Sequence, residues 1–387
     1  MKRRSISILI LCACFVSVAW SQQPAGKCYN SWAQFHRYDM QRWNRCEKVL
    51  NVNNVGNLHR KWRYRTGAYV DSSPAVTNGV VYVGSTDGNV YALNAKTGAL
   101  LWSYTTGGEV DSSPAVANGV VYVGAGTNVY ALNAKTGALL WSYTTRGYIS
   151  GDSSPAVANG VVYVGGSYDD TNVYALNAST GALLWSYTTG GFVYSAPAVA
   201  NGVVYVGSGD NNVYALNATT GAELWSYTTG NAVDSSPAVA NGVVYVGSWD
   251  NNVYALNAST GALLWSYPTG YYVASSPAVA NGVVYVGSGA FGSPGNLYAL
   301  NATTGALLWS YTTGYMLVSS PAVANGAVYV GSTDNNVYAL NAKTGALLWR
   351  YTTGGSVGSS PAVANGVVYV GSDDYKVYAF GLKKGRE

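Results

Sequence analysis

Four aspartates with a shared position are the side chains of this sequence best placed to do chemistry. Each stands three residues before a repeated proline: Asp71, Asp111, Asp152 and Asp234. Carboxylate oxygens are ligands that Ca²⁺ prefers, so these acids together can hold a cation, or one of them can act as a base. The alternative is structural, because Asp also accepts hydrogen bonds from the following Ser backbone in a turn. Acids that converge without a cation should have a raised proton affinity.

Aromatic residues gather in the segments beside these aspartates. Exposed aromatic side chains at loop tips are typical of interaction sites, so we expect a binding face there for a protein, small-molecule or glycan ligand. Drift of tolerant loops explains the variation between copies equally well. The candidates are Tyr69, Tyr148, Tyr168, Tyr194, Trp249, Tyr271, Tyr272, Phe291, Tyr315 and Tyr375.

Other catalytic chemistries find no support. Both histidines, His36 and His59, lie outside the repeats, and no Ser/His or Cys/His pairing or metal-ligand spacing of His or Cys occurs. The glycines recur with the turns of the repeat rather than in a phosphate-binding loop. We therefore assign no catalytic residue, and the identity of any metal stays open.

A repeat of about forty residues must position all these side chains. Its copies are spaced 40, 41, 42, 40, 40, 44 and 40 residues apart. Periods of this size indicate propellers or solenoids. The repeated prolines that mark the copies are Pro74, Pro114, Pro155, Pro197, Pro237, Pro277, Pro321 and Pro361.

Each copy reads as four short antiparallel strands. Ser-Pro-Ala-Val-Ala is followed by Asn-Gly, the strongest short hairpin signal, and then by Val-Val-Tyr-Val-Gly, Asn-Val-Tyr-Ala-Leu-Asn and Ala-Leu-Leu-Trp. Four such strands make a propeller blade. Alternating strand direction places the Asn-Gly and Thr-Gly turns on one face, and the Asp-bearing and aromatic loops on the other.

The two ends of the repeat region complement each other. Trp62 belongs to an orphan fourth strand before the first copy, and the last copy stops after its third strand at 377–380. Joining them completes one blade and closes the ring, which removes exposed sheet edges at the seam. We therefore predict an all-β fold: a single eight-bladed propeller over residues 57–381.

The run Ala92-Leu-Asn-Ala-Lys-Thr97-Gly98-Ala-Leu-Leu-Trp102 resembles the tryptophan-docking motif of the pyrroloquinoline-quinone (PQQ) repeat family, with Asn where that family usually has Asp. Residues 57–67 resemble the family's lead-in segment. The resemblance implies that each Trp packs between neighbouring blades and buries on the order of 200 Å². These blade anchors are Trp62, Trp102, Trp141, Trp185, Trp225, Trp265, Trp309 and Trp349.

Quinoprotein dehydrogenases of that family bind a tricarboxylate quinone with Arg or Lys, hold Ca²⁺ with acidic and amide side chains, use an Asp base and often join adjacent cysteines. This chain has no cysteine in the propeller, and its loops offer few cations, chiefly Arg146 and Lys376. We therefore expect no cofactor, although PQQ and Ca²⁺ remain possible.

The ends of the chain lie outside the repeats. Residues 1–21 resemble a secretory signal, which favours export, and Leu11-Cys12-Ala13-Cys14 also resembles a lipoprotein box, a less favoured alternative. Residues 22–56 form an amino-terminal arm in which Cys28 and Cys46 are expected to form a disulfide. Residues 382–387 form a basic tail.

Charge argues against a nucleic-acid partner. Removing residues 1–21 leaves a net charge of 18 − 17 = +1. Beyond the arm, the basic cluster at 383–386 is typical of a solvated tail. We expect no transmembrane segment and a monomer. The leading hypothesis is an exported, non-enzymatic binding scaffold, similar in type to the propeller of outer-membrane protein assembly. The alternatives are a small PQQ- and Ca²⁺-dependent dehydrogenase of alcohols or sugars, and an extracellular adhesin or carbohydrate-binding propeller.

Overall fold

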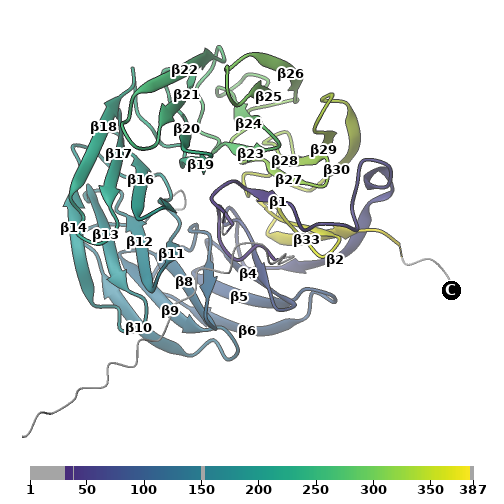
Figure 1. Cartoon of the computed structure of the whole chain (residues 1–387). Coiled ribbons are helices and arrows are strands. Elements are labelled where there is room, and N and C mark those ends of the chain that lie inside the picture. The colour runs from purple at the N-terminus through teal and green to yellow at the C-terminus, as the bar shows by residue number, and fades with distance from the viewer. Residues whose placement is uncertain (1–30, 38, 150–152, 384–387) are drawn as a thin grey trace, which may run out of the picture.

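Eight antiparallel sheets stand around a central axis and form a closed β-propeller (Figure 1). The computed structural model describes residues 31–37, 39–149 and 153–383. The expected signal at 1–21, Cys28, Asp152 and tail residues 384–387 lie outside this part. The described part contains one short helix, η1 (Val55–Asn57). The predicted eight-bladed all-β propeller is confirmed.

None of the helical structure in the described residues is long and apolar enough to cross a membrane.

The first four blades follow one another along the chain. Blade 1 contains β3 (Ala75–Thr77), β4 (Val80–Gly84), β5 (Asn89–Asn94) and β6 (Leu100–Thr105). Blade 2 contains β7 (Ala115–Ala117), β8 (Val120–Ala125), β9 (Asn128–Asn133) and β10 (Leu139–Thr144). Blade 3 contains β11 (Ala156–Ala158), β12 (Val161–Gly165), β13 (Asn172–Asn177) and β14 (Leu183–Thr188). Blade 4 contains β15 (Ala198–Ala200), β16 (Val203–Gly207), β17 (Asn212–Asn217) and β18 (Glu223–Thr228).

The remaining blades continue around the ring, and the last one uses both ends of the chain. Blade 5 contains β19 (Ala238–Ala240), β20 (Val243–Gly247), β21 (Asn252–Asn257) and β22 (Leu263–Pro268). Blade 6 contains β23 (Ala278–Ala280), β24 (Val283–Ser288), β25 (Asn296–Asn301) and β26 (Leu307–Thr312). Blade 7 contains β27 (Ala322–Ala324), β28 (Ala327–Gly331), β29 (Asn336–Asn341) and β30 (Leu347–Thr352), with the two-residue β1 (Trp43–Asn44) added beside β27. Blade 8 contains β31 (Ala362–Ala364), β32 (Val367–Ser372), β33 (Lys376–Gly381) and β2 (His59–Arg65).

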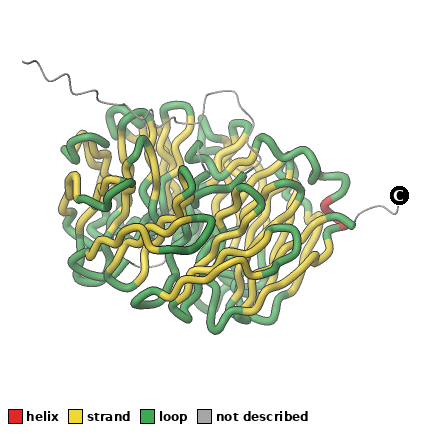
Figure 2. The backbone as a smooth tube through the Cα atoms, turned by 90° about the horizontal axis from the view of Figure 1, so that it is seen from below, coloured by secondary structure: helices red, strands yellow, loops and turns green. Residues whose placement is uncertain are grey.

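The predicted closure is confirmed by the pairing of β2 with β33. Trp62 lies opposite Ala379, and Arg65 lies opposite Lys376. The amino-terminal strand is therefore the outer strand of the last blade, as the orphan Trp strand indicated. Figure 2, a side view, shows the strands in yellow and the connecting loops and turns in green.

The repeated turns fit their sequences. Asn78 and Gly79 join β3 to β4 with φ values of 50° and 76°, and Thr77 pairs with Val80 across them. Positive φ at both positions is what a two-residue type I′ hairpin requires. Gly98 has φ 75°, and a Cβ added there would lie 2.7 Å from the Trp62 ring. Glycine in the Thr-Gly turn is thus needed for both conformation and close approach.

Each blade-anchor tryptophan reaches the next blade. Trp102 donates a hydrogen bond from Nε1 to the Ala134 carbonyl at 3.0 Å, and its ring packs on Gly137. The other seven make the equivalent bond: Trp62, Trp141, Trp185, Trp225, Trp265, Trp309 and Trp349. Because this bond satisfies the indole N–H, the aromatic body is available for the apolar layer between blades.

Candidate functional site

The two faces of the ring carry different connections. The turn face carries the Asn-Gly turn of every blade and the Thr-Gly turn of blades 1 to 7; blade 8 has no Thr-Gly turn because its third and fourth strands come from the two ends of the chain. The loop face carries the loops between the second and third strands of each blade and the connections between blades. The copies differ mainly on the loop face. The candidate aspartates and aromatic residues all belong to its loops and connections.

The arm runs along the inner edge of the ring (Figure 1). Trp32 and Val76 of blade 1 exchange two backbone hydrogen bonds of 2.7 and 2.6 Å. The corresponding valine of every other blade except blade 4 also makes a hydrogen bond to the arm. Four of them donate from the backbone N–H to arm carbonyls: Val116 to Ala33, Val239 to Met40, Val279 to Gln41 and Val323 to Arg42. Val157 N donates to the Gln34 side chain, and the Val363 carbonyl accepts from the Asn44 side chain. The arm thus pairs polar groups that inner-edge strands would otherwise present to the channel. Cys46 at its far end is buried and disulfide-bonded.

Arg42 fixes this arrangement from the centre of the arm. It is fully buried, at 0 % exposure, and its guanidinium bonds backbone carbonyls. Nε donates to Pro321 at 2.9 Å, Nη2 donates to Ser320 and Pro361 at 3.3 Å each, and Nη1 donates to Phe35 at 2.5 Å. Burial lowers the pKa of Arg42 to about 9, so the side chain remains charged at neutral pH. The arm is therefore locked to blades 7 and 8.

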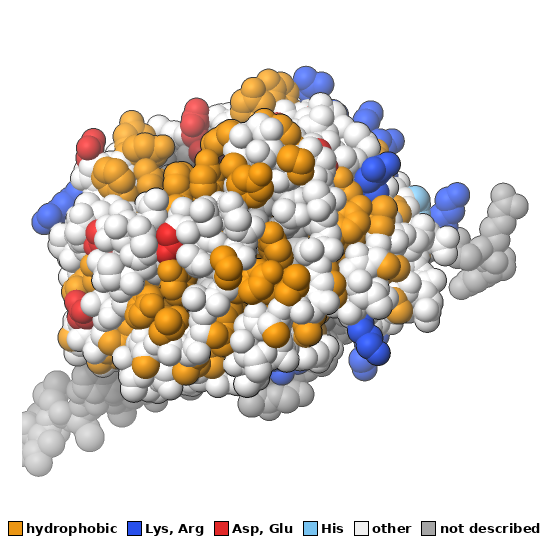
Figure 3. All heavy atoms as spheres, turned by 90° about the horizontal axis from the view of Figure 1, so that it is seen from above, with side chains coloured by type: hydrophobic (Ala, Val, Ile, Leu, Met, Phe, Trp, Pro, Cys, Tyr) orange, Lys and Arg blue, Asp and Glu red, His pale blue; other side chains and the backbone are white. Residues whose placement is uncertain are grey.

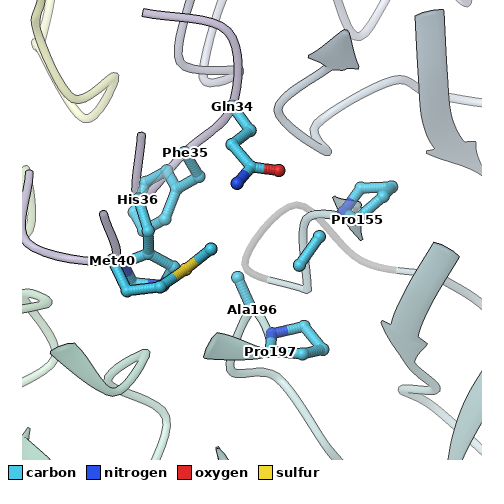
Figure 4. A pocket seen from close by; sticks show the side chains of 8 residues that line it. Gln34, Phe35, His36, Met40, Pro155, Ala196 and Pro197 are labelled. Atoms are coloured by element: carbon cyan, nitrogen blue, oxygen red, sulfur yellow. The ribbon is translucent and has the colours of Figure 1, made fainter. Parts of the chain in front are cut away.

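At blade 4 the arm packs by contact instead of by backbone pairing. His36 and Met40 lie against Ala196 and Pro197 around a cleft that leaves no room for a water molecule (Figure 4). Neither ring nitrogen of His36 has a hydrogen-bond partner among the described residues. Burial, together with the charge of Arg42, lowers the pKa of His36 to about 3, so the imidazole is neutral at physiological pH.

Serine residues link the blades near the same edge. The second Ser of each Ser-Ser-Pro accepts a hydrogen bond from the backbone N–H of the preceding blade, as when Ser73 N donates to Ser113 Oγ at 3.0 Å. The series returns to its start where Ser360 N donates to Ser73 Oγ at 2.9 Å. Blade 4 has Ala196 at this position, so one hydroxyl acceptor of this serine ring is missing there.

The described candidate aspartates, Asp71, Asp111 and Asp234, each stand four residues before the inner strand of their blade. Asp71 is exposed, and Asp111 and Asp234 are half-buried. A Cβ added at Gly358, the equivalent position of blade 8, would lie 3.3 Å from Asp71 Oδ1. Asp71 therefore lies close to the equivalent position of blade 8. Among the described residues, however, no three His, Cys, Asp or Glu side chains are grouped as a metal site.

A second set of aspartates holds the loop face together. In blade 4, Asp210 Oδ2 accepts hydrogen bonds from Tyr214 Oη and Gly190 N, both at 2.6 Å. Burial alone would raise the pKa of Asp210, but the hydrogen bonds from Tyr214 and the backbone lower it below the usual value. The same Asp–Tyr clasp occurs at Asp87, Asp170, Asp250, Asp334 and Asp374.

The predicted aromatic residues form separate clusters on the loop face. Tyr69 and Tyr375 lie with ring centroids 5.2 Å apart. Tyr168 and Tyr194 meet at 5.8 Å, and both contact Phe192, which was not among the predicted residues.

Blades 5 and 6 contribute the most ordered aromatic pair and the most exposed ring. Trp249 stacks on Tyr272 at 5.2 Å with an interplanar angle of 13°. The other aromatic tips remain largely in solvent: Tyr148, Tyr271, Phe291 and Tyr315. Phe291 is 79 % exposed, although the Tyr315 hydroxyl anchors the neighbouring Gly292 N–H at 2.8 Å.

Sequence reasoning missed several residues that shape the site. The Asp–Tyr clasp has a readable signal, since Asp-x-Asn-x-Tyr recurs, as in 210–214. The serine ring likewise follows the repeated Ser-Ser-Pro. Arg42 and His36 have no such signal, because they occur once and mainly meet backbone groups and apolar side chains.

Comparison with protein families and known sequences gives one family. A model described as outer membrane protein assembly factor BamB matches residues 58–192, 126–232, 213–321 and 293–387. Comparison with curated protein sequences gives no match.

Solved structures share the fold at low sequence identity. The quinohemoprotein alcohol dehydrogenase from Comamonas testosteroni superposes with a TM-score of 0.81 at 18 % identity, covering 95 % of this chain and 84 % of that one. Quinohemoprotein alcohol dehydrogenase ADHIIG from Pseudomonas putida HK5 gives 0.80 at 20 % identity, covering 92 % and 81 %. BamB from Moraxella catarrhalis gives 0.71 at 22 % identity, covering 85 % and 99 %.

Proposed function

The chain belongs to the family described as outer membrane protein assembly factor BamB, and from that premise we propose that it is an exported, non-enzymatic scaffold that binds a protein on its loop face. The observation that carries the proposal is the exposed aromatic surface of that face. Large apolar side chains without cover on a soluble ring favour an interaction site. The family description names protein assembly, which favours a protein partner over a glycan.

The aromatic clusters suit a binding role because part of their order is already present. Trp249 and Tyr272 hold each other by stacking, and Tyr168, Phe192 and Tyr194 form a contiguous cluster. Rings ordered before binding lose less conformational entropy on association. Tyr, Trp and Phe are also enriched at the centres of protein interfaces.

The alternative function is a PQQ- and Ca²⁺-dependent dehydrogenase, which is favoured by the shared fold of the two alcohol dehydrogenase structures. The described residues do not fit the cofactor. A tricarboxylate needs cations around it, but Lys376 is engaged with Asp374 at 2.9 Å and Arg146 lies exposed on a loop. Asp71, Asp111 and Asp234 would repel its carboxylates.

A cofactor titration separates the two functions. Purified full-length protein is mixed with PQQ and Ca²⁺, and binding and dye reduction with alcohols and sugars are measured. The scaffold proposal predicts neither saturable uptake nor substrate-dependent reduction. Uptake at nanomolar to micromolar concentrations together with dye reduction would establish the dehydrogenase instead.

Site-specific photo-crosslinking tests the partner surface. A photoreactive amino acid at Phe291, 79 % exposed on the loop face, should give a discrete protein adduct in the producing cells. The matched position is Leu264, 50 % exposed on the rim, which should give none. Equal adducts from both positions would contradict a loop-face site. Glycan-array binding that is lost in Trp249→Ala would favour the carbohydrate-binding alternative.

A further inference from the structure

The outer strand of blade 8 differs in charge from the outer strands of the other blades. Aligned on its tryptophan, β2 carries Arg60, Lys61, Arg63 and Arg65 where β6 carries Leu100, Leu101, Ser103 and Thr105. All four cations are exposed. Four of the 21 Lys and Arg residues of the chain thus lie in one seven-residue strand. The cluster at 383–386 is therefore not the only basic cluster beyond the arm.

The charge of β2 is not neutralised by ion pairs within the described chain. The ion pairs there are Arg37–Asp39, Arg45–Asp39 and Lys376–Asp374, none of which involves β2. Figure 3 shows Lys and Arg side chains gathered mainly toward the side where Figure 1 places β2 and the carboxyl end. This strand is therefore a concentrated basic stripe on a chain with little net charge.

The backbone of β2 is also open on one side. In the order β2-β33-β32-β31 it stands at the end of its sheet and pairs only with β33. Its seven residues, with one register shift between Arg60 and Trp62, present an edge of roughly 20 Å. Unpaired N–H and C=O groups on such an edge can pair with another strand.

Protection of this edge does not explain the charge. Charged side chains on edge strands commonly prevent unwanted pairing. The other outer strands stand at sheet edges too, yet they carry leucines that are 45–50 % exposed, with isolated charges at Glu223 and Arg350. If protection of the sheet edge required four cations on β2, the outer strands of the other blades would require them too.

We propose that β2 binds an extended acidic peptide segment of a partner protein, which adds as a further strand to blade 8. Main-chain hydrogen bonds along the open edge supply affinity, and carboxylates opposite Arg63 and Arg65 supply selectivity. A lipid surface or a nucleic acid would use the cations but not the strand edge. The aromatic residues of β2 are also unavailable for base stacking, because Trp62 bonds to Ala95 of blade 1 and Tyr64 packs on Tyr91.

This site lies on the rim and can exist without a partner on the loop face, although Arg65 reaches the loop-face residue Tyr375, with its guanidinium carbon 6.0 Å from the ring centroid. The first test measures fluorescence anisotropy of a labelled six-residue peptide of alternating Glu and Val with the full-length protein. We expect saturable binding that weakens as added salt screens the charges. The double variant R63S/R65T should bind about fivefold more weakly, since two exposed charge pairs are lost.

The chain provides its own controls for folding and for charge. Ser103 and Thr105 occupy the matching positions of blade 1, so R63S/R65T should keep the wild-type unfolding midpoint. R350S removes one Arg from the outer strand of blade 7 and should leave binding within about twofold. Equal losses in R63S/R65T and R350S would overturn the assignment to β2.

The second test separates strand addition from charge attraction. A peptide of the same sequence that is N-methylated at every amide keeps its charge but can donate no main-chain hydrogen bond to the edge of β2, and should bind at least tenfold more weakly. Hydrogen exchange at the amides of 59–65 should slow when the unmodified peptide binds. Equal affinity for both peptides would overturn the proposal, as would binding of anionic phosphatidylglycerol vesicles or an oligonucleotide without peptide binding.

Discussion

The inner edge of the ring and its loop face are held by different means. At the inner edge, backbone groups, serine hydroxyls and one buried arginine satisfy one another away from water. On the loop face, half-exposed carboxylates accept hydrogen bonds from tyrosines and loop amides, and aromatic rings remain uncovered. The difference indicates that the inner edge is satisfied within the fold, whereas the loop face leaves aromatic rings exposed, which is the surface we propose for a partner. Stability measurements can test this division.

Replacing Arg42 with Ala should produce the largest effect. Four carbonyls, those of Phe35, Ser320, Pro321 and Pro361, would lose their donor in a buried site. We expect a loss of about 3 kcal/mol in the free energy of unfolding, measured with guanidinium chloride. Arg45→Ala is the control, because this side chain is 51 % exposed and should matter by less than about 0.5 kcal/mol. Equal losses in the two variants would refute the role of Arg42 as the lock of the arm.

His36 should make the inner edge sensitive to mild acid. Its pKa is about 3 in the fold and about 6.5 in the unfolded chain, so the unfolded state binds the extra proton between these values. Stability should therefore fall below pH 6.5, by about 1.4 kcal/mol per pH unit from this residue alone. His36→Phe should show a shallower decline between pH 7 and pH 5. A His59→Asn control should change the slope less, because burial and the charges of Lys61 and Lys383 also lower the pKa of His59 but this side chain is only partly buried. Identical slopes in wild type and His36→Phe would contradict the prediction.

The loop face should keep its stability to a lower pH than the inner edge, and each of its residues should contribute less to the free energy of unfolding. The pKa of Asp210 is lowered in the fold, so its contribution is fully present above the unfolded pKa of about 4 and is lost as pH falls through the folded value. Asp210→Asn should cost about 1 kcal/mol at pH 7, less where solvent screens this half-exposed site. The difference from wild type should shrink as the pH falls below the unfolded pKa of about 4. Glu109→Gln, on an exposed side chain, should change little at either pH.

The architecture could be predicted because the repeat carries it. Proline spacing, Asn-Gly turns and the orphan strand at Trp62 indicated eight blades and their closure. The course of the arm could not, since Arg42 and His36 occur once and their partners are backbone or apolar groups that every copy offers. Asp71 lies close to the equivalent position of blade 8, Gly358, but convergence of the four aspartates stays a prediction. Residue spacing did not indicate how the carboxylates are oriented, which decides whether they can share a cation.

The path of the arm has a consequence for how the chain matures. Arg42 bonds a carbonyl 319 residues further along the chain, and β2 must wait for β33. The arm and β2 are made before the blades but reach their final positions after them, because contacts between residues so far apart in the sequence are slow to form. Until then, the inner edges of the early blades lack the hydrogen-bond partners that the arm supplies.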